Sequence, residues 1–319
     1  LQNLEQQLGI VVPAEKGMDT MACMNAASKG EIDVALLLGG NLYGSNPNSA
    51  FASDALNKIP FKLFINTTMN QSHVFGVGGE VMVLPCAARD EEKQKTTQES
   101  MFNFVRMSDG GIVRLNNVKS EVDIISELAE RICGASPLDF STFKSHANIR
   151  SAISTVIPGF ELLSKLDNTG KEFQISGRTF HDPGFPTANK KANFTVHPIP
   201  KANRREGENV YSLMTVRSEG QFNTIIYEDK DLFRDQTERW IVLMNQEDMK
   251  SSGMVADTLV DIKSDTGVME AVKVRPFDIA RGCLLSYFPE ANVLSSTEVD
   301  VRSKTPAFKS IPVTLVNRN

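Results

Sequence analysis

The apolar positions in the first part of the chain alternate between helical spacing and short continuous runs. Asp19 can cap a helix that stops at Gly30, and the apolar run from Val34 to Leu38 follows directly. Continuous apolar runs of this length are typical of parallel strands that are buried on both faces. A helix followed by a buried strand therefore predicts an α/β fold.

The same alternation continues further along the chain. Asn48 begins an Ala-rich helix that ends near Lys58, and buried strands are predicted at 61–65 and 81–84. A helix capped by Ser120 has an apolar face up to residue 132, and residues 136–166 are mainly helical. We therefore predict a doubly wound parallel-sheet domain over residues 1–170.

The pattern changes after residue 170. Residues 171–205 are rich in Pro, Gly, Phe and Lys, which is typical of an extended segment between domains. The rest of the chain is dominated by short β-branched or apolar runs, at 211–216, 240–244, 258–262, 268–274, 283–288 and 311–316. These runs predict a mostly β domain over residues 171–319 that forms a small closed barrel, with a brief helix after Asn245 and a hairpin turn at 265–267.

Composition narrows the possible partners. The 319 residues include 34 Lys and Arg against 39 Asp and Glu, a net charge of −5, so no general attraction to nucleic acid or anionic lipid is expected. No apolar run approaches the ~20 residues that cross a bilayer. We expect a cytoplasmic protein with neither nucleic acid nor membrane as a partner. The chain begins at Leu1 inside an amphipathic segment, and we expect it to be a fragment of a longer protein.

Cysteine and histidine, which often act in catalysis or bind metals, are dispersed along the chain. The four cysteines form no C-x-x-C pair, and the four histidines form no H-x-x-x-H pair, so no metal site is predicted. Free thiols in a reducing compartment are the expectation. A G-x-S-x-G elbow is also missing, so a hydrolase has no support. We assign no catalytic residue and no metal ligand to this chain.

Two polar loops follow the first two predicted strands. Gly39, Gly40 and Asn41 come after the first strand, and Thr67 and Gln71 lie in the loop after the second. Open α/β sheets bind ligands where the chain leaves the carboxyl ends of such strands. Neither loop has a dinucleotide or P-loop fingerprint. The loops predict either contacts to a nucleotide or simple turns.

Four later segments resemble one known superfamily. They are Met214 to Thr224, Asn245 to Met249, Tyr287 to Leu294 and Thr305 to Lys309. In this order, after an α/β domain with two polar loops, they resemble the last two domains of the molybdopterin oxidoreductases, and most of all the branch similar to formate dehydrogenase alpha subunits. The resemblance implies a double-psi barrel and a bis-molybdopterin guanine dinucleotide (molybdenum) cofactor.

The resemblance also implies that parts of the active site belong to other domains of the same protein. In this superfamily the molybdenum ligand and any iron–sulfur cluster belong to the N-terminal half, so the chain would be catalytically incomplete. Its partners would be the missing N-terminal domains of the same protein and a small-molecule substrate such as formate. The alternative is a stand-alone nucleotide- or partner-binding module without redox activity, which a genuine start codon at Leu1 would favour.

The resemblance implies a role for each candidate binding residue. Arg217 would bind pyrophosphate or a pterin carbonyl, and Lys309 would lie near a phosphate. Gln221 and Asn223 would read the pterin edge, with Tyr287 and Asn292 beside the pterin. The guanosine end would contact the loop residues Gly39, Gly40, Asn41, Thr67 and Gln71. Without the resemblance, the same side chains would be interpreted as turn residues, a barrel-wall aromatic and solvated cations.

Overall fold

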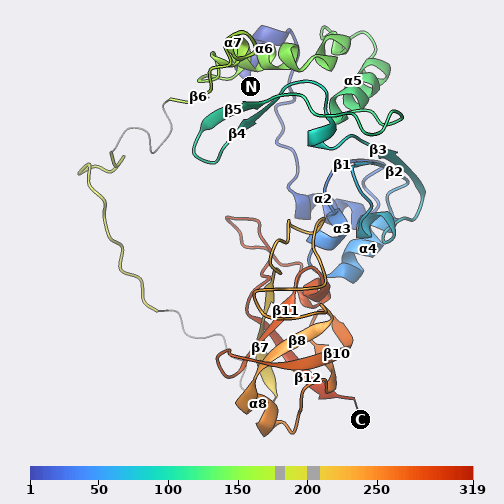
Figure 1. Cartoon of the computed structure of the whole chain (residues 1–319), viewed down its shortest axis with the longest axis vertical. Helices are drawn as coiled ribbons and strands as arrows, with labels where there is room; N and C mark the ends of the chain where they lie inside the picture. Colours follow the sequence, from blue (N-terminus) through green and yellow to red (C-terminus); the bar gives the residue numbers. More distant parts are fainter. Residues whose placement is uncertain (177–183, 200–208, 319) are drawn as a thin grey trace. The chain divides into compact units, whose positions relative to one another are not determined.

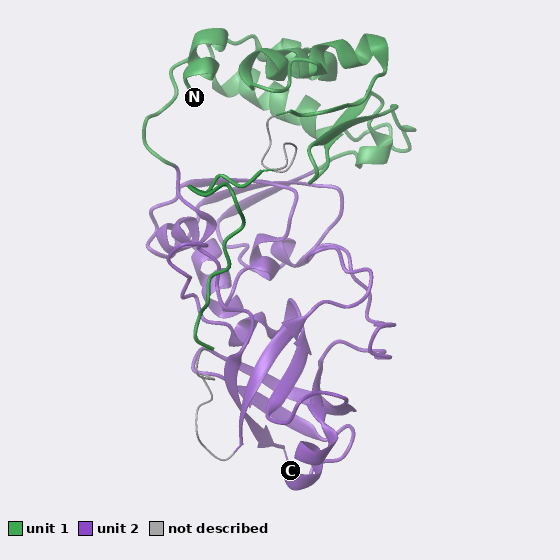
Figure 2. Cartoon of the chain, turned by 90° about the vertical axis from the view of Figure 1, so that its left-hand side faces the viewer, with its two compact units in different colours: residues 1–16, 85–199 green, residues 17–84, 200–319 purple. Residues whose placement is uncertain are grey.

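The computed structural model of the chain describes residues 1–176, 184–199 and 209–318. It forms two compact units (Figure 2), one of residues 1–16 and 85–199 and the other of residues 17–84 and 200–319. We call them unit 1 and unit 2. The predicted boundary between residues 170 and 171 stays a prediction, and the predicted extended segment 171–205 lies partly outside the described residues.

Unit 2 contains the predicted parallel sheet. Its elements are α2 (Thr20–Ser28), β1 (Val34–Leu38), α3 (Leu42–Ser45), α4 (Ser49–Asn57), β2 (Phe61–Asn66), η1 (Gln71–His73) and β3 (Glu80–Pro85). Strands β1 and β2 pair in parallel, which confirms the predicted parallel sheet. The strand order is β1-β2-β3, so the reversal of order that defines a doubly wound sheet is not seen in these three strands.

Local sequence explains where these helices begin. The Asp19 carboxylate accepts from the Ala22 N–H at 2.9 Å, and the Asn48 side chain accepts from the Phe51 N–H at 3.1 Å. Helices α2 and α4 then pack against each other through small residues, with Met24, Ala27, Ala52, Ala55 and Leu56 in a common core. Short side chains let the two helices approach closely, and Ala35 of β1 packs against them. Val34, Leu36 and Leu38 are at least half exposed, so the prediction that this strand is buried on both faces is wrong.

The barrel of unit 2 confirms the second prediction. It is built from β7 (Val210–Val216), β8 (Ile241–Asn245), β9 (Leu259–Lys263), β10 (Val268–Phe277), β11 (Cys283–Tyr287) and β12 (Ile311–Asn317), with α8 (Gln246–Ser251) and η4 (Glu290–Leu294) between strands. These six strands close in the order β10-β8-β11-β7-β12-β9. Buried side chains such as Leu213, Val242 and Leu284 fill the interior. The double-psi assignment stays a prediction.

Unit 1 is built from helices and a small antiparallel sheet (Figure 1). Its elements are α1 (Gln2–Leu8), η2 (Arg89–Glu91), β4 (Thr96–Glu99), β5 (Phe104–Ser108), α5 (Glu121–Ile132), η3 (Phe140–Lys144), α6 (His146–Val156), α7 (Leu163–Thr169) and β6 (Phe173–Gln174). The sheet β4-β5-β6 was not predicted, because the Thr-Thr-Gln-Glu strand has no apolar alternation. Val105 and Phe173 pack with α7 to form the core of unit 1.

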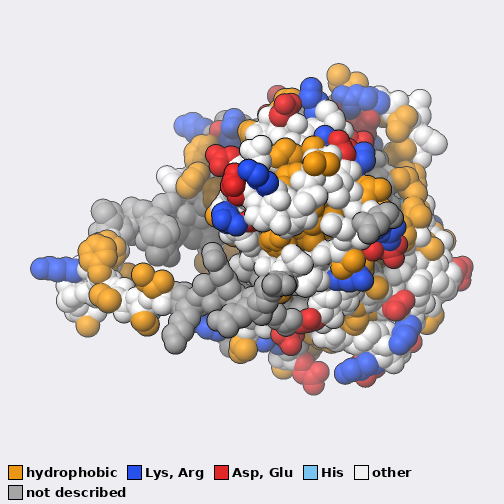
Figure 3. Space-filling view, turned by 90° about the horizontal axis from the view of Figure 1, so that it is seen from below, with side chains coloured by type: hydrophobic (Ala, Val, Ile, Leu, Met, Phe, Trp, Pro, Cys, Tyr) orange, Lys and Arg blue, Asp and Glu red, His pale blue; other side chains and the backbone are white. Residues whose placement is uncertain are grey.

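The surface shows no large area of one charge on the face drawn in Figure 3, where Lys and Arg alternate with Asp and Glu. All four cysteines are free thiols. Across the described ranges, no three His, Cys, Asp or Glu side chains gather closely enough to hold a metal ion. Within the same ranges, every helix is too short or too polar to cross a membrane.

Candidate functional site

The two polar loops meet the barrel within unit 2, and Asn41 is the first contact. Its side chain is buried at 3% exposure and caps α3 by accepting from the Gly44 N–H at 2.9 Å. The same amide oxygen accepts from the Ser72 hydroxyl at 2.8 Å, and the amide nitrogen donates to the Thr224 carbonyl at 2.9 Å. One side chain therefore joins the loops after β1 and β2 to the segment between β7 and β8.

Asn292 of η4 forms the second contact between the loops and the barrel. Its amide nitrogen donates to the Gly44 carbonyl at 2.8 Å and the Asn46 carbonyl at 3.1 Å. Its backbone carbonyl accepts from the Asn48 N–H at 2.8 Å. The side chain is fully buried, and its amide oxygen has no hydrogen-bond partner among the described residues. Asn292 thus holds the start of α4 against the barrel.

Arg239 organises the segment between β7 and β8. Its buried guanidinium lies between the rings of Tyr227 and Tyr287, 4.4 and 4.8 Å from their centroids. It donates to both Glu290 carboxylate oxygens, at 2.6 and 3.0 Å, and to the Ser218 hydroxyl at 2.8 Å. A bidentate arginine pair has fixed geometry, so Arg239 sets the positions of both partners.

Gln221 belongs to the same network. Its amide oxygen accepts from the Ser218 N–H at 3.0 Å, and its amide nitrogen donates to the carbonyls of Asn223 and Phe288, each at 2.7 Å. Arg239 also donates to the Phe288 carbonyl at 2.7 Å. The Gln221 amide is therefore used inside the protein to shape this segment.

Tyr287 is likewise bound within the protein. It is 1% exposed, and its hydroxyl donates to the Asp231 carboxylate at 2.7 Å. Burial, followed by the neighbouring Asp231, raises the pKa of Tyr287, so the phenol stays neutral. Burial also raises the pKa of Asp231, but hydrogen bonds from the Glu219 N–H, Arg234 and Tyr287 outweigh it and leave that pKa below its usual range.

Two exposed cations lie close to this network. The Arg217 guanidinium carbon is 5.9 Å from the Phe288 ring centroid, and the Lys309 ammonium donates to the Thr215 carbonyl. The pKa of Lys309 is lowered by burial first, and then by the charges of Arg217 and Arg234. Arg234 is paired with Asp231, whereas no described carboxylate lies within 4 Å of Arg217 or Lys309. This cationic edge, Arg217 and Lys309, therefore carries uncompensated positive charge.

The remaining predicted residues have other positions. Gly39 and Gly40 turn the chain with φ of 64° and 72°, values that glycine adopts without strain. Thr67 is exposed, and Gln71 accepts from the Asn41 amide at 3.5 Å. Asn223 is exposed with φ of 52°, a turn conformation that asparagine tolerates. The predicted binding roles of these residues stay predictions.

A cavity of about 440 Å³ opens in unit 2 beside η4. Its walls include the aromatic side chains of Tyr43, Phe75 and Trp240, with polar groups from Gln71 and Glu290. Tyr43 and Phe75 are stacked with ring centroids 4.7 Å apart. Ligand sites are commonly cavities of this size with apolar walls and a few polar groups.

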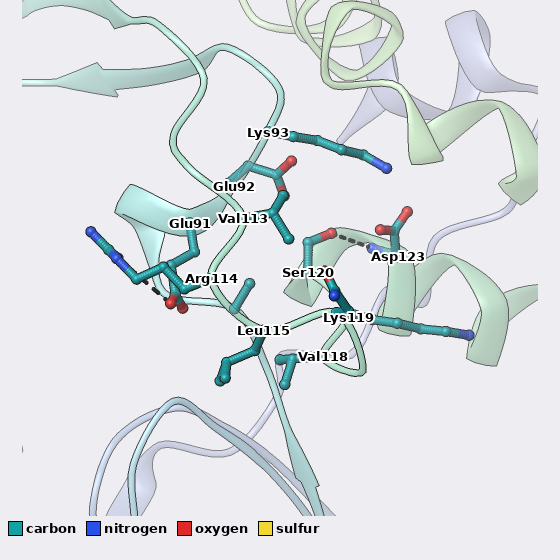
Figure 4. Close-up of a pocket in the computed structure, with 12 residues that line it drawn as sticks. Glu91, Glu92, Lys93, Val113, Arg114, Leu115, Val118, Lys119, Ser120 and Asp123 are labelled. Atoms are coloured by element: carbon teal, nitrogen blue, oxygen red, sulfur yellow. Dashed lines mark hydrogen bonds and ion pairs between the residues drawn. The ribbon is translucent and has the colours of Figure 1, made fainter.

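A second cavity, of about 240 Å³, lies in unit 1 at the start of α5 (Figure 4). Charged side chains line it, but two of its cations are already paired. The Arg114 guanidinium lies 2.8 Å from the Asp90 carboxylate, and the Lys119 ammonium lies 2.7 Å from Glu127. Because its charges largely compensate one another, this cavity is a weaker candidate than the site in unit 2.

Comparisons with known proteins identify a family match in the barrel and several relatives of the chain. Residues 211–312, which span the barrel, match the family described as the molydopterin dinucleotide binding domain. An uncharacterized oxidoreductase of Mycobacterium tuberculosis is 29% identical over 335 residues, covering 99% of this chain and 43% of the relative. Protein YdeP of Escherichia coli is 25% identical over 339 residues, covering 100% of this chain and 44% of the relative.

A solved structure shares the fold. Acetylene hydratase from Pelobacter acetylenicus superposes with a TM-score of 0.66 at 14% identity, covering 93% of this chain and 46% of that chain. The family match and the relatives named as oxidoreductases support the molybdopterin oxidoreductase superfamily and a molybdopterin-type cofactor. The chain spans less than half the length of the curated relatives it matches.

Sequence reasoning missed several residues that organise the site. Arg239 and Asp231 are the main examples, together with the cavity residues Tyr43, Phe75 and Trp240. Arg239 and its partner Glu290 are 51 positions apart, so no local spacing relates them. A single Trp directly after an Arg at the start of a predicted strand is the only local signal, and it does not indicate a partner.

Proposed function

We propose that this chain forms the dinucleotide-binding part of a molybdopterin-dependent oxidoreductase similar to formate dehydrogenase alpha subunits, with bis-molybdopterin guanine dinucleotide as the cofactor. The observation that carries the proposal is the cationic edge of Arg217 and Lys309 within the segment that matches the dinucleotide-binding family. Two neighbouring cations that have no carboxylate partner among the described residues suit a pyrophosphate group.

The chemistry of these residues fits a dinucleotide. The Arg217 guanidinium offers a planar fork for two phosphate oxygens, and Lys309 adds a point charge. Burial first, and then repulsion from Arg217 and Arg234, lowers the pKa of Lys309, and a bound anion would offset that repulsion. The side chains of Asn41, Gln221 and Asn292 contribute indirectly, because their hydrogen bonds hold the loops that would surround the cofactor.

These contacts suggest which steps the cofactor performs and which the residues of this chain perform. When bound, the cofactor supplies the redox chemistry that oxidises a small substrate such as formate. Residues of this chain bind and orient its phosphate and base groups, and the molybdenum ligand and any iron–sulfur cluster lie outside this chain. The partners we propose are therefore the N-terminal domains of the same protein and a small-molecule substrate.

Arg217→Ala tests the cationic edge. We expect the Kd for inorganic pyrophosphate to rise about two- to fivefold, because a charge pair at an exposed position contributes about 0.5–1 kcal/mol. Calorimetric titration of the whole chain measures the effect, and the equivalent change at exposed Arg302 is the control. Equal affinity of the Arg217 and Arg302 variants would count against the proposal.

The pH dependence of pyrophosphate binding tests Lys309. The pKa of this ammonium lies below its usual value in the free protein, and its charged form is the one that binds the anion. Affinity should therefore be full at neutral pH and fall as the pH rises through the lowered pKa, earlier than for an ordinary lysine. Lys309→Arg should remove this loss in the same titrations, since arginine stays charged. An unchanged profile in that variant would exclude Lys309 as the titrating group.

A further inference from the structure

We propose that the N-terminal domains of the same protein dock on β1, where they add a parallel strand to its free edge and cover its exposed face with an apolar helix. The inference rests on the proposed function, which makes those domains the partners of this chain, and deepens it by giving them a docking surface. The residues concerned are Val34, Leu36 and Leu38, which the cofactor proposal does not use.

Strand β1 has the composition of a strand that is buried on both faces. All five of its residues, Val34–Leu38, are apolar. A strand with one solvated face normally alternates apolar and polar residues, whereas continuous apolar runs are typical of parallel sheets with both faces covered. The structure of this chain exposes one of the two faces. The composition of β1 therefore indicates a cover that the described residues do not supply.

The two faces of β1 have different surroundings. Successive side chains of a strand point to opposite faces, and Ala35 packs in the core that α2 and α4 share. The residues of the opposite face, Val34, Leu36 and Leu38, are 61%, 50% and 50% exposed. Contiguous apolar side chains that remain in water mark an interaction surface more often than an ordinary protein surface.

The edge of β1 is free as well. The strand order is β1-β2-β3, and β1 pairs with β2 alone among the described residues. Leu36 and Leu38 have direct register partners in β2. These partners, Leu63 and Ile65, are only 6% and 0% exposed. The same face is thus buried at β2 and exposed at β1, as expected where a sheet lacks its next strand.

The geometry of parallel sheets and the length of the relatives point to the occupant. A parallel neighbour of β1 needs a crossover connection, usually a helix, which packs onto a face of the sheet. One unit of strand and helix would therefore supply both the pairing and the cover. This chain matches 43% and 44% of the length of the mycobacterial and YdeP relatives, so more than half of each lies outside the match. That length is ample for such a unit.

Thiol labelling of Leu36→Cys tests the inference. The variant would be made in this chain and in the full-length protein, and peptide mapping by mass spectrometry separates the new thiol from the four native ones. We expect maleimide to react about tenfold more slowly in the full-length protein, because a buried thiol is inert. Val255→Cys, at a 71% exposed position of unit 2, is the control and should react equally in both. Equal labelling of Leu36→Cys in the two proteins would overturn the inference, as would a gene that encodes nothing beyond this chain.

A charge on the same face gives an independent measurement. Leu36→Glu should shift the urea midpoint of this chain no more than Val255→Glu does, because both positions are exposed. In the full-length protein, Leu36→Glu should raise hydrogen exchange across β1 and β2 about tenfold relative to Val255→Glu, since it separates the docked parts. No difference between the two variants there would count against the inference.

A second copy of this chain is the rival occupant, because free strand edges also pair between identical chains. Sedimentation of this chain distinguishes the two. We expect a monomer, whereas a dimer that Leu36→Glu dissociates would assign the surface to a second copy and overturn the inference.

These outcomes are separate from those of the cofactor proposal, whose pyrophosphate titrations are made on this chain alone. If Leu36→Cys is protected in the full-length protein but Arg217→Ala leaves pyrophosphate affinity unchanged, the docking surface stands and the cationic edge fails. The reverse pair of results removes only the docking surface.

Discussion

Arg239→Met is expected to lower the free energy of unfolding of unit 2 by about 3–5 kcal/mol, the usual cost of removing one partner of a buried ion pair. The change leaves the Glu290 carboxylate without its bidentate partner and the Ser218 hydroxyl without a donor. Met has similar length and fills the space between the two tyrosine rings, so the loss reports the charge and hydrogen bonds more than a cavity.

Urea denaturation followed by circular dichroism and by Trp240 fluorescence measures this effect, because the single tryptophan lies in unit 2. Arg302→Met is the matched control at an exposed position and should stay within about 0.5 kcal/mol of wild type. Arg239→Lys should fall between the two, since an ammonium cannot reproduce a bidentate fork. A cost below 1 kcal/mol for Arg239→Met would show that the network does not organise the site.

Asn292→Asp is the second change with a large expected effect. The two side chains have nearly the same shape, but the new carboxylate has no donor to offer the Gly44 and Asn46 carbonyls. The position is fully buried, so we expect a loss of about 3–5 kcal/mol at neutral pH, as for other uncompensated buried charges.

The pH dependence of this variant gives an independent check. Burial and two carbonyl oxygens raise the folded-state pKa of an aspartate here, so the variant should be closest to wild type below about pH 4, the ordinary pKa of Asp. Its stability should fall as the pH rises above that value, because the folded state binds the proton more tightly. Thermal unfolding across the pH range measures this, with Asn223→Asp in an exposed turn as the control. A pH-independent difference would contradict the explanation.

Several helices and strands were predictable because the sequence signals for them lie within a few neighbouring residues. The run Val34 to Leu38 and the caps at Asp19, Asn48 and Asn245 each depend on neighbours within four residues, and the structure has a strand or a helix at each of them. The β4–β5 hairpin was missed because polar strands in a small sheet carry no such pattern. Double winding depends on the order of the strands in the sheet, and a short segment of sequence does not contain that information.

The surroundings of the candidate binding residues were predictable only in part. The resemblance pointed to Arg217 and Lys309, which are exposed and have no carboxylate partner among the described residues, and their binding role stays a prediction. It also pointed to Gln221, Tyr287 and Asn292, whose polar groups form hydrogen bonds to the protein's own loops and carboxylates. A sequence pattern identifies which residue type stands at a position, but it does not show whether its hydrogen bonds go to a ligand or to the protein.

The sequence by itself determined the alternation of helices and strands in the first part of the chain and the closed barrel in the second. Only the tertiary structure decided which polar groups meet. Asn41 reaches Thr224 across 183 positions, and Asn292 reaches Gly44 across 248. Secondary structure follows from short-range sterics and periodicity, whereas these contacts depend on the path of the whole chain, which brings distant residues together.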